Sequence, residues 1–100
     1  MNTVIVRYKV KADQSDDNVD FVGAVFAGLK GESPEGVRYA TFVADDGVTF
    51  FHIASFDDGV ENPLPQLDAF KAFQMGLGDR CEEGPVPTSV KEVASYNFFS

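Results

Sequence analysis

The sequence contains no tryptophan, only one cysteine and one histidine, and half as many basic residues as acidic ones. The single Cys81 cannot form an internal disulfide, so a reducing compartment suits the chain. One His and one Cys, without clustered ligands, do not predict a metal site. The net charge of −8 argues against nucleic acid and anionic membranes as partners, because phosphate groups require a basic surface.

Long apolar runs are also missing. None approaches the roughly 20 residues that a helix needs to cross a bilayer, and no charged-then-apolar leader opens the chain. Together with the lone cysteine, these absences predict a cytoplasmic, acidic protein. The 100 residues suffice for one hydrophobic core but not for two, so we expect a single domain over residues 1–100.

 Ten of the 100 residues are Phe. Two runs rich in aromatic and β-branched residues flank Asp45-Asp46-Gly47, and they predict antiparallel strands at Arg38–Ala44 and Val48–Phe56. Alternation divides the second strand into two faces: Phe50, His52, Ala54 and Phe56 on one, and Thr49, Phe51, Ile53 and Ser55 on the other. Both faces carry large apolar groups, so both need cover.

The remaining elements follow from periodicity. Thr3–Lys11 alternates and predicts a first strand, with Val4, Val6, Tyr8 and Val10 on its apolar face. Helical spacing after the capping run 13–17 predicts a helix at Asp17–Lys30. An apolar stripe predicts a second helix, and its members are Leu64, Leu67, Phe70, Phe73 and Leu77. We expect Asp79–Pro87 to be a loop and Ser89–Phe99 to be the last strand.

This order of elements, βαββαβ, predicts a ferredoxin-like α+β fold, with a four-stranded antiparallel sheet and two helices on one face. No part of the chain is left to cover the other face of the sheet, which carries aromatic side chains. A patch of that kind marks a partner surface. A second copy, packed sheet against sheet about a twofold axis, is the commonest closed solution. We therefore predict a homodimer.

Three stretches carry a family resemblance: PEGVRYATFVADDGVTFFHIASFDD, LDAFKAF and SVKEVASYNFF. They resemble the dimeric α+β barrel superfamily, and within it the antibiotic biosynthesis monooxygenase-like domains. The resemblance implies a homodimer whose two sheets form an α+β barrel, with a small-molecule cavity inside each half and no cofactor. Members include cofactor-independent oxygenases of polyphenolic substrates and haem-degrading enzymes. Those enzymes rely largely on Trp together with Asn or His, so a chain without Trp inherits no catalytic residue from them.

Four residues are candidates for a ligand site. His52 could exchange protons near neutral pH, which makes it the candidate catalytic residue, or it could be a hydrogen-bonded core residue. Arg7 could anchor a carboxylate or phenolate, or it could form a salt bridge to Glu92 or remain a solvated charge near the rim of the dimer. Tyr39 and Tyr96, like Tyr8, could offer hydroxyl groups to a cavity, or they could simply pack with one satisfied hydroxyl.

Two functions remain open at this point. The first is a small-molecule-binding dimeric barrel protein, a cofactor-independent monooxygenase-like enzyme that acts on an apolar or aromatic substrate. The alternative is a non-catalytic dimeric assembly or ligand-sensing module whose barrel is filled by side chains. Cavity volume separates the two, because an open pocket lined by His52 or Arg7 weakens the second and a filled barrel defeats the first.

Overall fold

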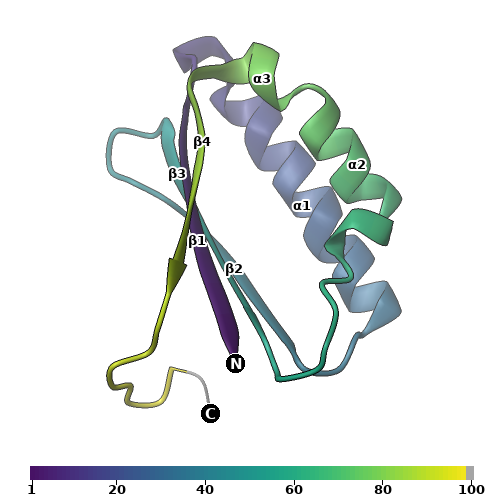
Figure 1. Cartoon of the computed structure of the whole chain (residues 1–100). Helices are drawn as coiled ribbons and strands as arrows, with labels where there is room; N and C mark the ends of the chain where they lie inside the picture. The colour runs from purple at the N-terminus through teal and green to yellow at the C-terminus, as the bar shows by residue number, and fades with distance from the viewer. Residues whose placement is uncertain (99–100) are drawn as a thin grey trace.

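The structure, a computed structural model, describes residues 1–98. Four antiparallel strands form one sheet, and α1 and α2 lie on the same face of it (Figure 1). The strands, in the sheet order β2-β3-β1-β4, are β2 (Val37–Val43), β3 (Thr49–Phe56), β1 (Asn2–Val10) and β4 (Cys81–Val90). The helices are α1 (Ser15–Glu32), α2 (Asp68–Met75) and the short α3 (Leu77–Arg80). The ferredoxin-like α+β fold expected from the sequence is confirmed.

The central hairpin forms as predicted, because one aspartate organises its turn. The Asp46 carboxylate accepts hydrogen bonds from the backbone N–H groups of Val48 and Thr49 and from the Thr49 hydroxyl. These three bonds hold the pKa of Asp46 down, at about 2. Gly47 takes a positive φ of 77°, which costs glycine little because it has no Cβ.

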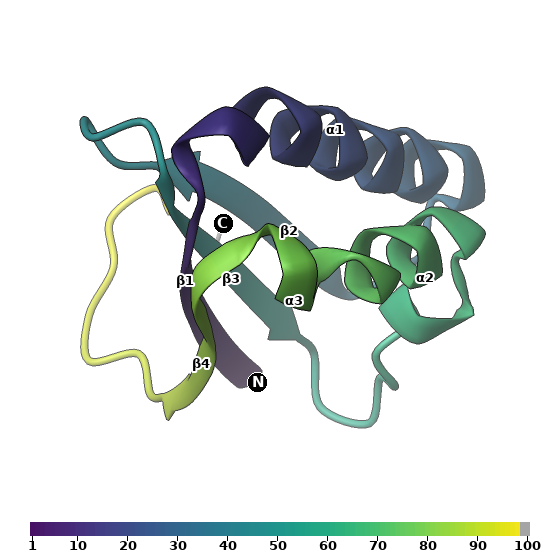
Figure 2. The same ribbon diagram turned by 90° about the horizontal axis from the view of Figure 1, so that it is seen from above.

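The core lies between the sheet and the two helices, as Figure 2 shows from above. Tyr8, Val10 and Phe50 project from the sheet and are buried against Val25 of α1 and Phe73 of α2. Burial of such side chains contributes roughly 1.5–3 kcal/mol each. The face of β3 that carries Phe50 and His52 is therefore the covered one. The face that carries Phe51 and Ile53, called the open face below, is turned away from both helices, and Phe98 lies near Ile53 on it.

Both helical regions match the predicted apolar stripes, but α1 is longer than expected and the second region is interrupted. α1 extends two residues beyond the expected Asp17–Lys30 at each end and stops where Ser33 takes a positive φ of 49°. The second stripe is divided among a 3-10 turn at Leu64–Gln66, α2 and α3. Because the breaks fall between members of the stripe, Leu64, Phe73 and Leu77 are all buried in one core.

The last strand is not where the pattern placed it. β4 runs over Cys81–Val90, the segment expected to be a loop, whereas residues 91–98 of the expected strand Ser89–Phe99 lie outside the sheet. Phe99 lies outside the described residues. The loop prediction rested on Pro85 and Pro87, but β4 is an edge strand, and an edge tolerates proline because its outer N–H groups have no partner strand. The pairing with β1 is irregular around Gly84 and Pro85, which accommodates them.

Candidate small-molecule site

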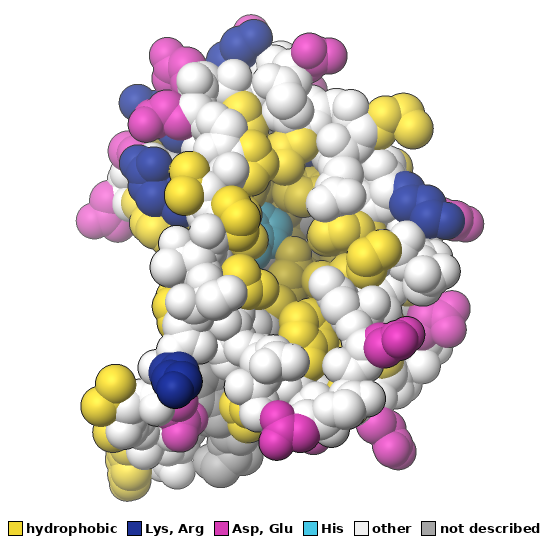
Figure 3. All heavy atoms as spheres, in the orientation of Figure 1, with side chains coloured by type: hydrophobic (Ala, Val, Ile, Leu, Met, Phe, Trp, Pro, Cys, Tyr) yellow, Lys and Arg dark blue, Asp and Glu magenta, His cyan; other side chains and the backbone are white. Residues whose placement is uncertain are grey.

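A cavity of about 150 Å³ lies between the covered face of the sheet and α2. Side chains of the sheet form one wall, namely Val4, Val6, Tyr8, Tyr39, His52 and Ala54. The opposite wall comes from the second helical region, with Leu64, Phe70, Phe73, Gln74 and Leu77, and Asn62 and Pro85 complete the lining. The cavity is open to solvent: Figure 3 shows a hollow rimmed by hydrophobic side chains, with the chain's single histidine inside it.

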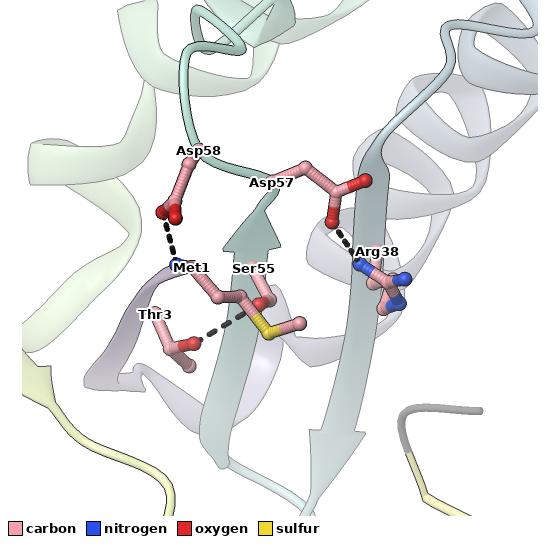
Figure 4. A network of polar contacts seen from close by, with 6 residues as sticks. All are labelled: Met1, Thr3, Arg38, Ser55, Asp57 and Asp58. Carbon is pink, nitrogen blue, oxygen red and sulfur yellow. Dashed lines mark hydrogen bonds and ion pairs between the residues drawn. The ribbon is translucent and has the colours of Figure 1, made fainter.

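The linker between β3 and α2 is tied to the sheet where it begins (Figure 4). The Arg38 guanidinium of β2 donates to the Asp57 carboxylate at 2.8 Å, and the Met1 amino group pairs with Asp58. The Asp57 backbone N–H also donates to the carbonyl of Gly36 at 2.9 Å. These contacts fix the start of the segment that brings Asn62 to the cavity wall.

His52 uses both ring nitrogens in hydrogen bonds. Its Nε2 lies 2.7 Å from the hydroxyl of Tyr8, and its Nδ1 lies 2.6 Å from the hydroxyl of Tyr39 and 3.1 Å from that of Thr41. The side chain is only 6% exposed. The three partners come from β1 and β2, the two strands that flank β3 in the sheet, so sheet register alone brings them to the imidazole.

The chain of hydrogen bonds continues from Tyr8 into the helices. The Asn18 amide of α1 donates to the Tyr8 hydroxyl at 2.9 Å, and Arg80 Nε donates to Asn18 Oδ1 at 3.2 Å. Arg80 also donates from Nη2 to the carbonyl of Phe73 at 2.8 Å. Its guanidinium lies 4.3 Å from the ring centroid of Phe21 and 5.4 Å from that of Phe73, so this buried cation is held by amide and carbonyl oxygens and by aromatic faces.

Burial shifts the proton affinities of the site in opposite directions. It lowers the pKa of His52 to about 4, since desolvation penalises the imidazolium. It raises the pKa of Tyr39 to about 12, and it raises that of Tyr8 further. At neutral pH the imidazole is therefore neutral and both phenols keep their protons. A neutral imidazole has one nitrogen without a proton, and this nitrogen can accept a hydrogen bond from a phenol.

This shift predicts that His52 makes the fold sensitive to acid. Because the folded pKa lies below the unfolded value near 6.5, the unfolded chain binds the extra proton first, and stability falls as the pH drops from about 6.5 toward 4. We expect the free energy of unfolding to fall by about 2.5 kcal/mol between pH 7.5 and pH 4.5 from this group. Urea unfolding of the wild type and of His52→Gln at both pH values measures it. Equal losses in the two proteins would contradict the assignment.

The predicted site residues divide between the two faces of the sheet. His52 and Tyr39 meet in the cavity, together with Tyr8. Arg7 lies on the open face, opposite Phe51 in the register, and its guanidinium is 3.9 Å from the carboxylate of Glu83 on β4. This ion pair replaces the salt bridge to Glu92 considered from the sequence, because β4 places Glu83 beside β1. Tyr96 lies beyond β4, is 89% exposed and does not line the cavity.

Sequence reasoning missed Asn18, Thr41 and Arg80. Asn18 had a usable signal, because it lies four residues before Val22 on the apolar stripe of α1, where a polar residue is buried and needs partners. Thr41 shares the covered face of β2 with Tyr39, which alternation could have shown. Arg80 had no such signal, since it falls in a segment expected to be an exposed loop.

Within residues 1–98, no group of three or more His, Cys, Asp or Glu side chains is placed to hold a metal ion. The helices of this described part are also too short or too polar to span a membrane.

No family model matches the sequence, and no curated protein matches it either. Solved structures do match. A crystal structure of an antibiotic biosynthesis monooxygenase aligns with a TM-score of 0.73 at 15% identity, covering 94% of this chain and all of the other (100%). Rv0793 from Mycobacterium tuberculosis aligns with a TM-score of 0.73 at 14% identity, over 94% and 96% of the two chains. SnoaB from Streptomyces nogalater, a cofactor-independent oxygenase, aligns with a TM-score of 0.70 at 12% identity, over 96% of each chain.

The chain shares the antibiotic biosynthesis monooxygenase-like fold. The resemblance read from the three sequence stretches is confirmed at the level of fold. At these identities the monooxygenase-like fold carries no residue role with it, so function has to be argued from the cavity and from His52.

Proposed function

We propose that this protein binds one ring of a small hydroxyaromatic molecule in the cavity and that the Tyr8–His52 pair takes the proton of the ligand hydroxyl. The observation that carries the proposal is a neutral, buried imidazole inside an apolar cavity that is open to solvent. An engineered apolar cavity of about 150 Å³ in another protein binds benzene, so one aromatic ring suits this volume. Val6, Phe70 and Phe73 supply apolar contacts to such a ring.

The proton has a path that the hydrogen bonds define. A ligand hydroxyl that approaches Tyr8 can donate to the phenolic oxygen while Tyr8 passes its own proton to Nε2 of His52, which lies 2.7 Å away. The products are a ligand anion and an imidazolium whose Nδ1–H stays bonded to Tyr39 or Thr41. Desolvation raises the cost of negative charge on Tyr8, and the hydrogen bond from Asn18 and the charge of Arg80 offset part of that cost.

An electron-rich ligand anion leads to the monooxygenase-like reaction. If the ring carries a CH₂ group, O₂ can convert it to C=O: one oxygen atom enters the product, the other leaves as water, and the substrate supplies all of the electrons. This balance needs no cofactor, as proposed from the sequence, and SnoaB of the same fold is a cofactor-independent oxygenase. Ligand binding without reaction is the second candidate, favoured by the fact that both nitrogens of His52 are already bonded within the protein.

Phenol is the first probe of the cavity. We expect added phenol to shift the ¹⁵N signals of the His52 imidazole and to bind at least tenfold more weakly to Ala54→Leu, because the larger side chain occupies space that Ala54 leaves in the cavity. Calorimetry and NMR titration measure binding. Ala24→Leu, on the exposed side of α1, is the matched control and should bind as the wild type does. Unchanged binding by Ala54→Leu would refute the site.

Oxygen uptake separates the two candidates. One- and two-ring phenols that carry a ring CH₂ group should consume O₂ in the presence of the wild type and not of His52→Gln if the protein is an oxygenase. Binding without uptake by any of these phenols would favour the ligand-sensing module.

The same proposal includes a homodimer in the cytoplasm, formed through the open face of the sheet. Ile5, Phe51 and Ile53 lie on this face, with the half-exposed Phe42 beside them on β2 and Val86 on β4. Both α1 and α2 lie on the other side of the sheet (Figure 2). A contiguous apolar face on a small domain is typical of an interface, and pairing with a second copy about a twofold axis is the commonest arrangement.

A further inference from the structure

We infer that Arg80 and Asn18 are positioning residues for His52: they fix the direction of the buried hydrogen-bond chain, so that His52 carries its proton on Nδ1 and presents Nε2 as the acceptor. The inference rests on the order of four groups, Arg80, Asn18, Tyr8 and His52, each within hydrogen-bond distance of the next. Arg80 can only donate hydrogen bonds, and this fixes first the orientation of the Asn18 amide and then the tautomer of His52.

The direction starts at Arg80, because a guanidinium has only donors. Its Nε–H must donate to Asn18, which requires the amide oxygen of Asn18 to face Arg80 at 3.2 Å. A flipped amide would set two N–H donors against each other and leave the buried Nε–H of Arg80 without an acceptor. The amide nitrogen of Asn18 therefore faces the Tyr8 hydroxyl, at 2.9 Å, and donates to it.

Tyr8 passes this direction to His52. Its oxygen already accepts from Asn18, and its single proton has one acceptor within reach, Nε2 of His52 at 2.7 Å. Nε2 must then be without a proton, and a neutral imidazole carries its proton on the other nitrogen. The Nδ1–H group donates to the hydroxyl of Tyr39, with that of Thr41 also in reach. Each group in this row of hydrogen bonds then has a partner. The same holds for all fully buried polar side-chain atoms of residues 1–98.

The tautomer decides what the site can do. When Nε2 is unprotonated, the imidazole can receive a proton through Tyr8. When Nε2 carries the proton, this path is blocked. This consequence rests on the proposed function, whereas the tautomer itself does not and can be measured in protein without ligand.

The test is the position of the imidazole proton. Long-range ¹H–¹⁵N correlations in uniformly ¹⁵N-labelled, tag-free protein at pH 8 report which ring nitrogen is protonated, and the single histidine leaves no overlap. We expect the proton on Nδ1 in the wild type. In Asn18→Asp, one carboxylate oxygen accepts from Arg80 and the other accepts the Tyr8 proton, so Tyr8 must accept from His52. The proton should then move to Nε2.

Asp20→Asn, an exposed change on the same helix, should leave the proton on Nδ1 as in the wild type. A folded Asn18→Asp protein that keeps its proton on Nδ1 would overturn the inference. If Asn18→Asp does not fold, the wild-type spectrum alone decides, because a proton on Nε2 in the wild type would also overturn the inference. If the tautomer prediction fails but phenol still binds, the proposed ligand site stands. If the tautomer is as predicted but phenol does not bind, only the proposed ligand site is rejected.

Discussion

Replacing Arg80 with Ala is expected to lower the free energy of unfolding by about 4 kcal/mol, a large part of the 5–15 kcal/mol that stabilises a typical domain. The side chain is only 5% exposed. Its loss leaves the Asn18 amide oxygen and the Phe73 carbonyl without their donor, and each such buried acceptor costs roughly 1–3 kcal/mol. The cation–π contacts with Phe21 and Phe73 are lost as well.

Urea unfolding at pH 7.5 measures the change, with two comparisons. Arg38→Ala removes an arginine from a partly exposed pair with Asp57 and should cost no more than about 1 kcal/mol. Arg80→Lys keeps the charge without the planar fork that reaches both oxygens, so its loss should be intermediate. Equal losses for Arg80→Ala and Arg38→Ala would show that Arg80 does not support the core.

The hairpin and the two helices could be predicted because their signals are local. Alternation, turn residues and helical stripes act over a few neighbours, and Asp46 organises the turn through hydrogen bonds to the nearby Val48 and Thr49. β4 could not be predicted in the same way. Pro85 and Pro87 mark a loop by local rules, and only the position of β4 at the sheet edge makes them acceptable in a strand.

The site was predictable only in part, because alternation separates two faces without saying which one is covered. His52 and Tyr39 were candidates on sound chemical grounds, and the register of β1, β2 and β3 brings them together. Arg7 follows the same alternation onto the other face. Arg80 depends on the turn at α3, which places a cation among aromatic rings at a distance of 62 residues from its partner Asn18, and no sequence pattern reports such a contact.

The assignment of faces also identifies which phenylalanine of β3 tests the proposed dimer. Phe51 lies on the open face and Phe50 in the core, so Phe51→Asp should weaken dimerisation by about 100-fold or more while the monomer stays folded. A carboxylate placed in an apolar interface loses its hydration without gaining a partner, and a 100-fold change corresponds to about 2.8 kcal/mol. Analytical ultracentrifugation over a range of protein concentrations measures the shift from twice the chain mass toward one.

Val19→Asp is the matched control, because Val19 is a half-exposed apolar residue of α1, away from the open face of the sheet. It adds the same charge and should leave the dimer intact. If both substitutions split the dimer, added negative charge on a chain of net charge −8 would be the cause and the sheet face would not be the interface. A wild type that sediments as a monomer at every concentration would refute the proposed dimer. The cavity would be unaffected, because every residue that lines it belongs to one chain.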